Sequence, residues 1–161
     1  MATAYLALGA NLGDPAAQIA AALARLDAHA EIAVAARSTA IATKPWGRTD
    51  QPDFINLVAQ VETGLAPTAL LDACLGIERA MGRVRAERWG PRLIDIDIVV
   101  YERLVFRTGR LTLPHPYAHG RGFVLGPLRE IAPEVADWIV AQANARKVGK
   151  RSSDKFLVVC E

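Results

Sequence analysis

Residues 94–101 read IDIDIVVY, and this stretch decides which fold the rest of the chain can form. Its β-branched residues are typical of a buried strand, while Asp95 and Asp97 interrupt it at a spacing of two. Because strand side chains alternate between the two faces of a sheet, both aspartates share one face and the three isoleucines take the other. We therefore expect one face to pack on a core and the other to present two carboxylates.

The elements before this strand predict a regular alternation. Pro15, after the capping residue Asp14, begins one helical pattern, Pro67 begins another, and Gly82 ends it. The expected order is a strand at 3–9, a helix to about 28, strands within 31–43 and at 54–63, a helix at 67–81 and the strand at 94–101. This βαββαβ order predicts a ferredoxin-like α+β fold, an antiparallel sheet backed by two helices.

The remaining segments are less regular, and we expect C-terminal additions to the sheet. Short strands are expected at 103–106 and 110–113, and a helix from about 123 to 132. Loops are expected at 44–53 and 83–93. The tail from about residue 145 is basic and then apolar, so either a short packed strand or a frayed end is expected there.

Size and composition bound the class of protein. A chain of 161 residues with 52% hydrophobic and 22% charged residues predicts one globular domain over residues 1–161. No apolar run reaches the roughly 20 residues of a membrane span, and the start MATAYLALG lacks the basic flank of a signal peptide. Cys74 and Cys160 lie far apart, which argues against a zinc site and favours a reduced, cytoplasmic protein.

Arginine is concentrated in one part of the chain. Eight arginines and four acidic residues lie between positions 83 and 121, although the whole chain carries a net charge of only +2. The planar guanidinium suits bidentate contact with phosphate. A phosphate-bearing ligand is one interpretation, and a solvated basic face is the other.

The paired aspartates predict a cation site. Two residues along a strand span roughly 6–7 Å, so Asp95 and Asp97 can converge on one metal or bridge two. Like charges this close repel each other, and burying them without a cation is costly. Oxygen ligands without histidine or cysteine favour Mg²⁺. The alternative is an exposed strand face whose aspartates pair with the nearby arginines, such as those of the loop 88–92.

Aromatic and amide residues indicate a second site. Phe54 and Asn56 share one face of a strand, and Trp46 and Phe123 add further rings. A flat heteroaromatic ring could stack on Phe54 while Asn56 donates to and accepts from its edge. Core packing of Phe54 and Phe123 is the alternative.

Two other functions match parts of this pattern. The run DIDIV at 95–99 matches the D-x-D-x-[TV] opening of haloacid-dehalogenase-type phosphatases, in which the aspartates normally end an N-terminal strand. An RNA-binding ferredoxin-like module would use the basic loop and an R-G-F block such as residues 121–123, but it has no use for paired strand aspartates. The chain contains no P-loop motif.

The run RWGPRLIDIDIV at 88–99 resembles the signature of the 6-hydroxymethyl-7,8-dihydropterin pyrophosphokinase family of folate-pathway enzymes. Further blocks resemble this family in the same order: LGANLGD at 8–14, DQPDFIN at 50–56, IE at 77–78, LPHP at 113–116 and RGFVL at 121–125. The resemblance covers about residues 1–135. It implies a ferredoxin-like fold and transfer of the β,γ-pyrophosphoryl group of ATP to the hydroxymethyl oxygen of the pterin, with AMP as the other product.

The resemblance also implies roles for individual residues. Asp95 and Asp97 are expected to hold two Mg²⁺ ions, and Arg83 and Arg92 to stabilise the charge that develops at the β-phosphorus. The residues expected to bind ATP are Glu78, Arg85, Arg88, Trp89, Ile98, Arg110, Thr112, His115 and Arg121. Those expected to bind the pterin are Thr43, Lys44, Trp46, Phe54, Asn56 and Phe123. A monomer without nucleic-acid or membrane partners is expected.

The chain departs from the family pattern at three places. The loop 82–88 is one residue shorter than in some members, which bears on the roles of Arg83 and Arg85. Leu75 stands where a glutamine often contacts the nucleotide, and Phe54 where a tyrosine can occur. The second replacement keeps the stacking surface and loses a hydroxyl group.

Overall fold

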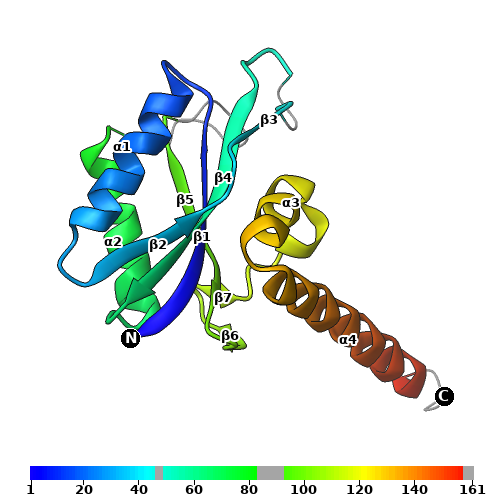
Figure 1. Ribbon diagram of the computed structural model, residues 1–161. Coiled ribbons are helices and arrows are strands. Elements are labelled where there is room, and N and C mark those ends of the chain that lie inside the picture. The colour runs from blue at the N-terminus through cyan, green and yellow to red at the C-terminus, as the bar shows by residue number, and fades with distance from the viewer. Residues whose placement is uncertain (46–48, 83–92, 158–161) are drawn as a thin grey trace.

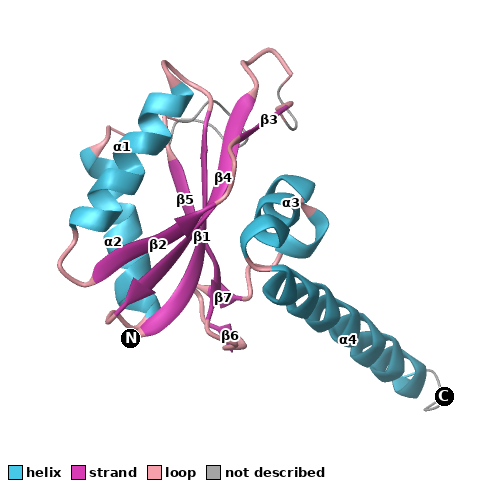
Figure 2. Cartoon of the chain, viewed as in Figure 1, coloured by secondary structure: helices cyan, strands magenta, loops and turns pink. Residues whose placement is uncertain are grey.

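The computed structural model describes residues 1–45, 49–82 and 93–157, with side chains described as far as residue 149. Its elements, shown in Figures 1 and 2, are β1 (Ala2–Ala10), α1 (Pro15–Ala28), β2 (Ile32–Arg37), β3 (Ile41–Thr43), β4 (Phe54–Thr63), α2 (Pro67–Ala80), β5 (Asp95–Tyr101), β6 (Phe106–Arg107), β7 (Thr112–Leu113), the short 3-10 helix η1 (Ala118–Gly120), α3 (Gly122–Ile131) and α4 (Pro133–Leu157). This order confirms the predicted βαββαβ arrangement, with the second strand divided into β2 and β3.

The main sheet is antiparallel throughout its described pairings. Its strand order is β2-β4-β1-β5, and β3 pairs with β4 beyond the end of β2. Helices α1 and α2 cover one face, and α3 lies on the opposite side of the sheet (Figure 1). The sheet therefore forms the middle layer of the molecule.

Local signals explain where the first helices begin. Asp14 accepts a hydrogen bond from the backbone N–H of Ala17 at 3.2 Å, and Pro15 occupies the first helical position, where no N–H is needed. Pro67 likewise occupies the first position of α2, although its N-cap residue, Ala66, makes no side-chain hydrogen bond. Both helix starts therefore lie where the sequence predicts them.

A hydrophobic core lies on each side of the sheet. The side that faces α1 and α2 buries the larger cluster, which includes Leu6, Leu8, Leu26, Leu70, Ile96 and Ile98. The side that faces α3 and α4 buries a smaller one, which includes Tyr5, Val58, Val99, Val124, Leu128 and Ile139. The second cluster is confined to one end of that face, which leaves the other end for polar side chains.

The C-terminal segments differ from expectation. The predicted short strands shrink to the two-residue pair β6 and β7, whereas α3 agrees with the predicted helix. The tail prediction is wrong: α4 runs without a break from Pro133 to Leu157. The segment AQANARKV at 141–148 consists mostly of good helix formers and contains no proline, so the helix propagates from its packed first turns. Within the described ranges, no helix combines the length and apolar character needed to cross a membrane.

Candidate active site

The alternation in β5 places its two aspartates as the sequence predicts. Ile96 and Ile98 are each 2% exposed and pack in the core against α1 and α2, whereas Asp95 and Asp97 are half-buried on the other face. The two carboxylates therefore leave the sheet on the side of α3.

A buried glutamate supports the strand between these aspartates. Glu78 of α2 is 2% exposed, and its Oε1 accepts a hydrogen bond from the backbone N–H of Ile96 at 2.7 Å. The carboxylate thus holds the strand from the core side, directly behind the aspartate pair. Its negative charge, together with that of Asp97, helps burial to raise the pKa of Cys74 to about 12.

The register of the sheet aligns the second predicted group with the aspartates. Gly9 of β1 lies opposite Asn56 on one side and opposite Asp95 on the other. Directly opposed residues of antiparallel strands point to the same face, so Asn56 and Asp95 flank Gly9 on the α3 side of the sheet. Two strand spacings separate them, roughly 10 Å.

Gly9 is required by this close approach. A Cβ atom at position 9 would lie 2.7 Å from Oδ1 of Asn56, a distance that real contacts do not show. The Asn56 side chain therefore lies over the bare backbone of Gly9. Its Nδ2 donates to Oγ1 of Thr43 at 2.7 Å, which orients the amide.

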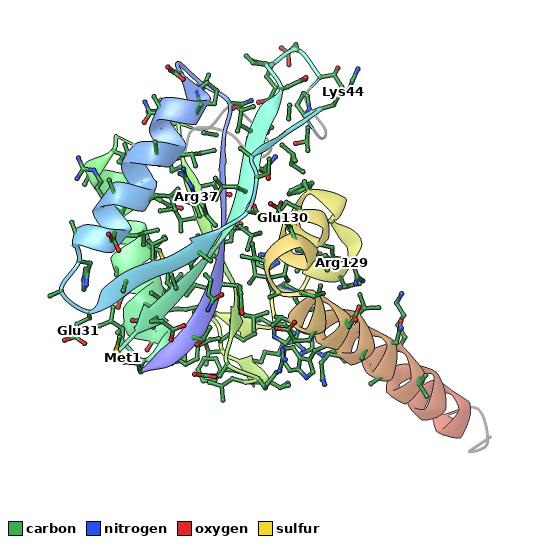
Figure 3. All side chains as sticks on the ribbon, viewed as in Figure 1. Met1, Glu31, Arg37, Lys44, Arg129 and Glu130 are labelled. Carbon is green, nitrogen blue, oxygen red and sulfur yellow. The ribbon has the colours of Figure 1, made fainter. Side chains whose placement is uncertain are left out.

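The predicted aromatic walls come from two separate elements. Phe54 lies opposite Thr43 in the β3–β4 pair, on the same face as Asn56, and is half-buried. Phe123, in the first turn of α3, packs against the smaller core cluster but remains half-buried. Among the described residues Phe54 belongs to neither core cluster, so core packing does not account for it. Lys44 is exposed just beyond β3 (Figure 3).

His115 lies between the aspartates and the start of α3. Its backbone N–H donates to the carbonyl of Val99, and its Nδ1 accepts from the backbone N–H of Tyr117 at 3.2 Å. Burial and, to a smaller extent, the Arg121 guanidinium lower the pKa of His115 to about 4, against the opposing effect of the Asp95 carboxylate. The imidazole is therefore neutral near pH 7, and because Nδ1 accepts a hydrogen bond, the proton lies on Nε2.

Two arginines of the predicted nucleotide site, Arg121 and Arg110, contact different elements of the fold. The guanidinium of Arg121 lies over the Tyr117 ring, 5.3 Å from its centroid, and over the Phe123 ring at 5.6 Å. Arg110 forms an exposed ion pair with Asp72 of α2. Thr112 is half-buried in β7.

The structure brings together only part of the predicted set. The residues of the expected site that lie outside the described part of the chain are Trp46, Arg83, Arg85, Arg88, Trp89 and Arg92. Their roles stay predictions.

Sequence reasoning missed Asn11, which fastens the segment before β4. It is 1% exposed, and its Nδ2 donates to Oε1 of Gln51 at 2.8 Å and to the carbonyl of Pro52 at 3.0 Å. We interpret the turn 9–13 as structural. Its Asn11 links the end of β1, the strand next to β5, to the segment that leads into Phe54. The signal was a small polar residue directly after an apolar strand.

Comparison with known proteins places the chain in a family. The family model described as 7,8-dihydro-6-hydroxymethylpterin-pyrophosphokinase (HPPK) matches residues 5–133. The 2-amino-4-hydroxy-6-hydroxymethyldihydropteridine pyrophosphokinase of Methylorubrum extorquens is 51% identical over 135 residues, covering 84% of this chain and 85% of the relative. The enzyme of the same name from Haemophilus influenzae is 44% identical over 135 residues, covering 84% of each.

Solved structures agree in fold. A crystal structure of wild-type Plasmodium falciparum HPPK-DHPS with SDX-DHP superposes with a TM-score of 0.61 at 16% identity, covering 83% of this chain and 40% of that one. A triple mutant of the same protein with STZ-DHP gives a TM-score of 0.65 with the same identity and coverage. The sequence matches extend from β1 to the start of α4, and by them the chain belongs to the HPPK family.

Proposed function

We propose that Asp95 and Asp97 hold two Mg²⁺ ions with which this pyrophosphokinase of folate biosynthesis positions ATP against 6-hydroxymethyl-7,8-dihydropterin. The carrying observation is the row across the sheet in which Asn56, Gly9 and Asp95 share one face. That row supports a pterin site and a metal–triphosphate site side by side, with no bulky side chain between them.

The donor set fits magnesium. Asp95 and Asp97 offer only oxygen atoms, and no cluster of three or more histidine, cysteine, aspartate or glutamate side chains suited to a metal occurs in the described ranges. Mg²⁺ is usually held by one or two carboxylates together with phosphate oxygens and waters, rather than by a cage of protein ligands. When bound, the ions would neutralise charge on the triphosphate and bring it to the aspartate face of β5.

For the pterin, we assign stacking to Phe54 and Phe123 and edge recognition to Asn56. The Thr43 hydroxyl accepts one of the two Asn56 Nδ2 hydrogens at 2.7 Å, which orients the amide so that Oδ1 can accept from an N–H group of the ring. The backbone around Thr43 and Lys44, together with Trp46, completes the expected contacts.

For ATP, we assign the neutral His115 and the cations Arg110 and Arg121. Nε2–H of His115 would donate to a phosphate or hydroxyl oxygen without adding charge, while Arg121 supplies a cation beside the aspartates. Thr112, Arg85, Arg88 and Trp89 belong to the same expected set.

Glu78 and Ile98 enter this proposal in a narrower way. Both side chains are buried on the core side of β5, so a nucleotide contact at Ile98 would use its backbone. Glu78 supports the strand through Ile96.

The transfer itself requires alignment and charge stabilisation. The hydroxymethyl oxygen forms a bond to the β-phosphorus, the bond from that phosphorus to the oxygen of the α-phosphate breaks, AMP leaves, and the hydroxyl proton passes to solvent. The stacked, edge-bound pterin presents its hydroxyl in one orientation. Arg83 and Arg92 would stabilise the negative charge that develops on the transferred group.

Product identity tests this proposal. The purified chain is incubated with ATP, Mg²⁺ and 6-hydroxymethyl-7,8-dihydropterin, and nucleotides are separated by chromatography. We expect AMP that appears only when the pterin is present. Formation of ADP, or AMP formation independent of the pterin, would contradict the assignment. Light scattering of the same sample tests the monomeric state that we also propose.

A further inference from the structure

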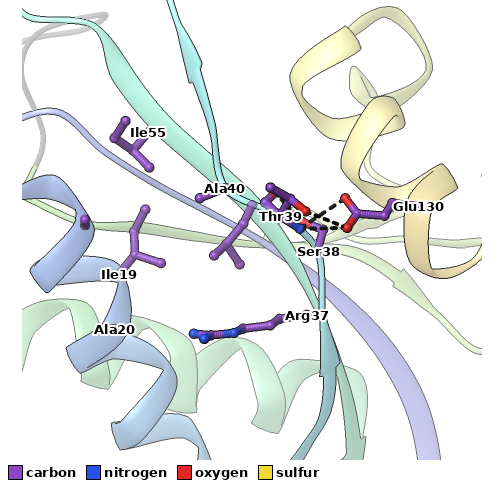
Figure 4. Close-up of a pocket in the computed structure, with 10 residues that line it drawn as sticks. Ile19, Ala20, Arg37, Ser38, Thr39, Ala40, Ile55 and Glu130 are labelled. Atoms are coloured by element: carbon purple, nitrogen blue, oxygen red, sulfur yellow. Dashed lines mark hydrogen bonds between the residues drawn. The ribbon is translucent and has the colours of Figure 1, made fainter.

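Glu130, in the last turn of α3, is joined to the bend between β2 and β3. Both of its carboxylate oxygens accept from the backbone N–H of Thr39 at 3.0 Å, and Oε1 also accepts from the Thr39 hydroxyl at 2.7 Å (Figure 4). A single side chain thus receives both donors of one residue in a different layer of the molecule.

Apart from Glu130, the described side-chain contact of the bend is with Ser38, whose hydroxyl donates to the Thr39 carbonyl at 3.1 Å. Beyond β2, Ser38 still bonds to β4: its N–H donates to the carbonyl of Val58, and its hydroxyl accepts from the Val58 N–H. The next strand, β3, begins only at Ile41. On the α1 side, a cavity of about 440 Å³ lies against the bend. The Glu130 carboxylate therefore supplies the partner for the Thr39 N–H and hydroxyl that the sheet pairing does not supply.

Glu130 lies in the last turn of α3, where a negative charge destabilises the helix, and this favours a specific role for its carboxylate. The C-terminal end of a helix carries partial negative charge, so an anionic side chain in the last turn of α3 is unfavourable for the helix. The neighbouring Arg129 does not offset it, because Arg129 forms its ion pair with Asp137 of α4. The contact with Thr39 compensates for a residue that the helix alone disfavours.

The two residues of this contact are connected to two parts of the proposed pterin site: one shares α3 with Phe123, and the other lies in the bend that leads into β3 and Thr43. Phe123 lies seven residues before Glu130 in α3, about two helical turns or roughly 10 Å away. Thr43, which orients Asn56, lies four residues after Thr39 along the bend and β3. The Glu130–Thr39 hydrogen bonds therefore connect the helix that carries one aromatic wall to the strand that carries the amide partner.

We propose that Glu130 is a positioning residue for the pterin, which sets the spacing between Phe123 and the Thr43–Asn56 pair. This inference rests on the pterin site proposed above. Glu130 touches no reacting atom and acts through β3 and α3. It predicts a defect confined to pterin affinity.

The test compares steady-state kinetics of Glu130→Gln and Thr39→Val with the wild type. Each change removes part of the contact, and we expect the KM for the pterin to rise about fivefold, the scale of one net hydrogen bond. The KM for ATP and kcat should stay within about twofold, since neither substitution touches the aspartate face. Thr39→Ser, which retains both donors, should restore the wild-type KM.

Arg129→Gln is the matched control. It removes a hydrogen-bonded ion pair from the adjacent position of α3 but leaves β3 untouched. An equal pterin KM in Arg129→Gln and Glu130→Gln would overturn the proposal, as would a rise in both KM values or a fall in kcat alone.

Pterin binding followed by fluorescence titration separates this proposal from the proposed function. If the wild type binds the pterin but forms no AMP, the function fails while the affinities of Glu130→Gln and Thr39→Val still decide the positioning role. If the wild type binds no pterin, both proposals fail. Combining Thr39→Val with Glu130→Gln should weaken binding by less than the product of the two separate effects, because both changes act on the same contact.

Discussion

The two faces of the central sheet use the same strands for different purposes. On the α1–α2 face, the β5 side chains that enter the continuous core are Ile96, Ile98 and Tyr101, and the buried carboxylate of Glu78 accepts a backbone hydrogen bond from the same strand. On the α3 face, apolar residues fill only one end, and the other end carries Asp95, Asp97 and Asn56. Adjacent residues of one strand thus serve stability and chemistry separately. Substitutions at neighbouring positions should therefore have opposite consequences.

The largest expected effect is on the aspartate side. Asp95→Ala or Asp97→Ala should lower AMP formation by about a thousandfold or more, because the cation that neutralises the triphosphate loses a ligand. The free energy of unfolding should hardly change, since a half-buried carboxylate beside another is not a stabilising group. Chromatographic assay and urea titration measure the two quantities. Asp137→Asn, on α4, is the control, and substantial turnover by either alanine variant would refute the metal assignment.

At Ile96, between the two aspartates, a substitution should lower stability rather than activity. Ile96→Ala removes a side chain that is 2% exposed from the larger core, and we expect a loss of about 2–4 kcal/mol in the free energy of unfolding. Urea unfolding checks this value. At a temperature where the variant is folded, its KM values should be close to those of the wild type. A fall in kcat as large as that of the aspartate variants would mean that the two faces are not independent.

The pH dependence of stability should report His115 on the α3 face. Its folded pKa of about 4 lies below the ordinary value of 6.5, so the unfolded chain binds a proton that the folded chain does not between these pH values. The stabilising contribution is fully present above about pH 6.5 and declines as the pH falls towards 4, by up to about 3 kcal/mol at about 1.4 kcal/mol per unit. His115→Gln should reduce this slope in urea titrations at pH 7 and pH 4.5. Equal slopes in the two proteins would contradict it.

The smallest expected effect concerns the bare strand between the two sites. Gly9→Ala places a Cβ atom 2.7 Å from Oδ1 of Asn56, so the amide must shift, and the KM for the pterin should rise about tenfold. Gly76→Ala in α2 is the control, because nothing lies within 4 Å of its added Cβ, and it should stabilise the helix by about 0.5–1 kcal/mol. An unchanged pterin KM in Gly9→Ala would remove Asn56 from the pterin site.

Period-two alternation explains how much of this could be predicted from the sequence. The pattern of residues 94–101 gives the faces of β5, and the same argument places Phe54 and Asn56 together. Asp14 and Pro15 locate the start of α1, because capping is a local property. Features that depend only on near neighbours in the chain were therefore predictable.

Contacts between residues far apart in the chain could not be predicted from the sequence. Thr39 and Glu130 are 91 positions apart, and nothing in either segment names the other. Asn11 and Gln51 meet across 40 positions in the same way. The tail was predicted wrongly for a different reason. Its basic and then apolar composition suggested a short packed strand or a frayed end, whereas the helix continues from its packed residues Val135 and Ile139.

The hydrogen bond between Glu78 and Ile96 gives the enzyme a built-in spectroscopic reporter. The Ile96 N–H donates to a buried carboxylate with a nitrogen-to-oxygen distance of 2.7 Å, and Ile96 lies between the two aspartates in the chain. Short hydrogen bonds to carboxylates draw electron density from the proton, so its resonance should lie downfield and exchange slowly with deuterium. Charge arriving at Asp95 and Asp97 acts on the same peptide groups. One amide resonance of the folded enzyme should therefore follow occupation of the aspartate face in the absence of any turnover.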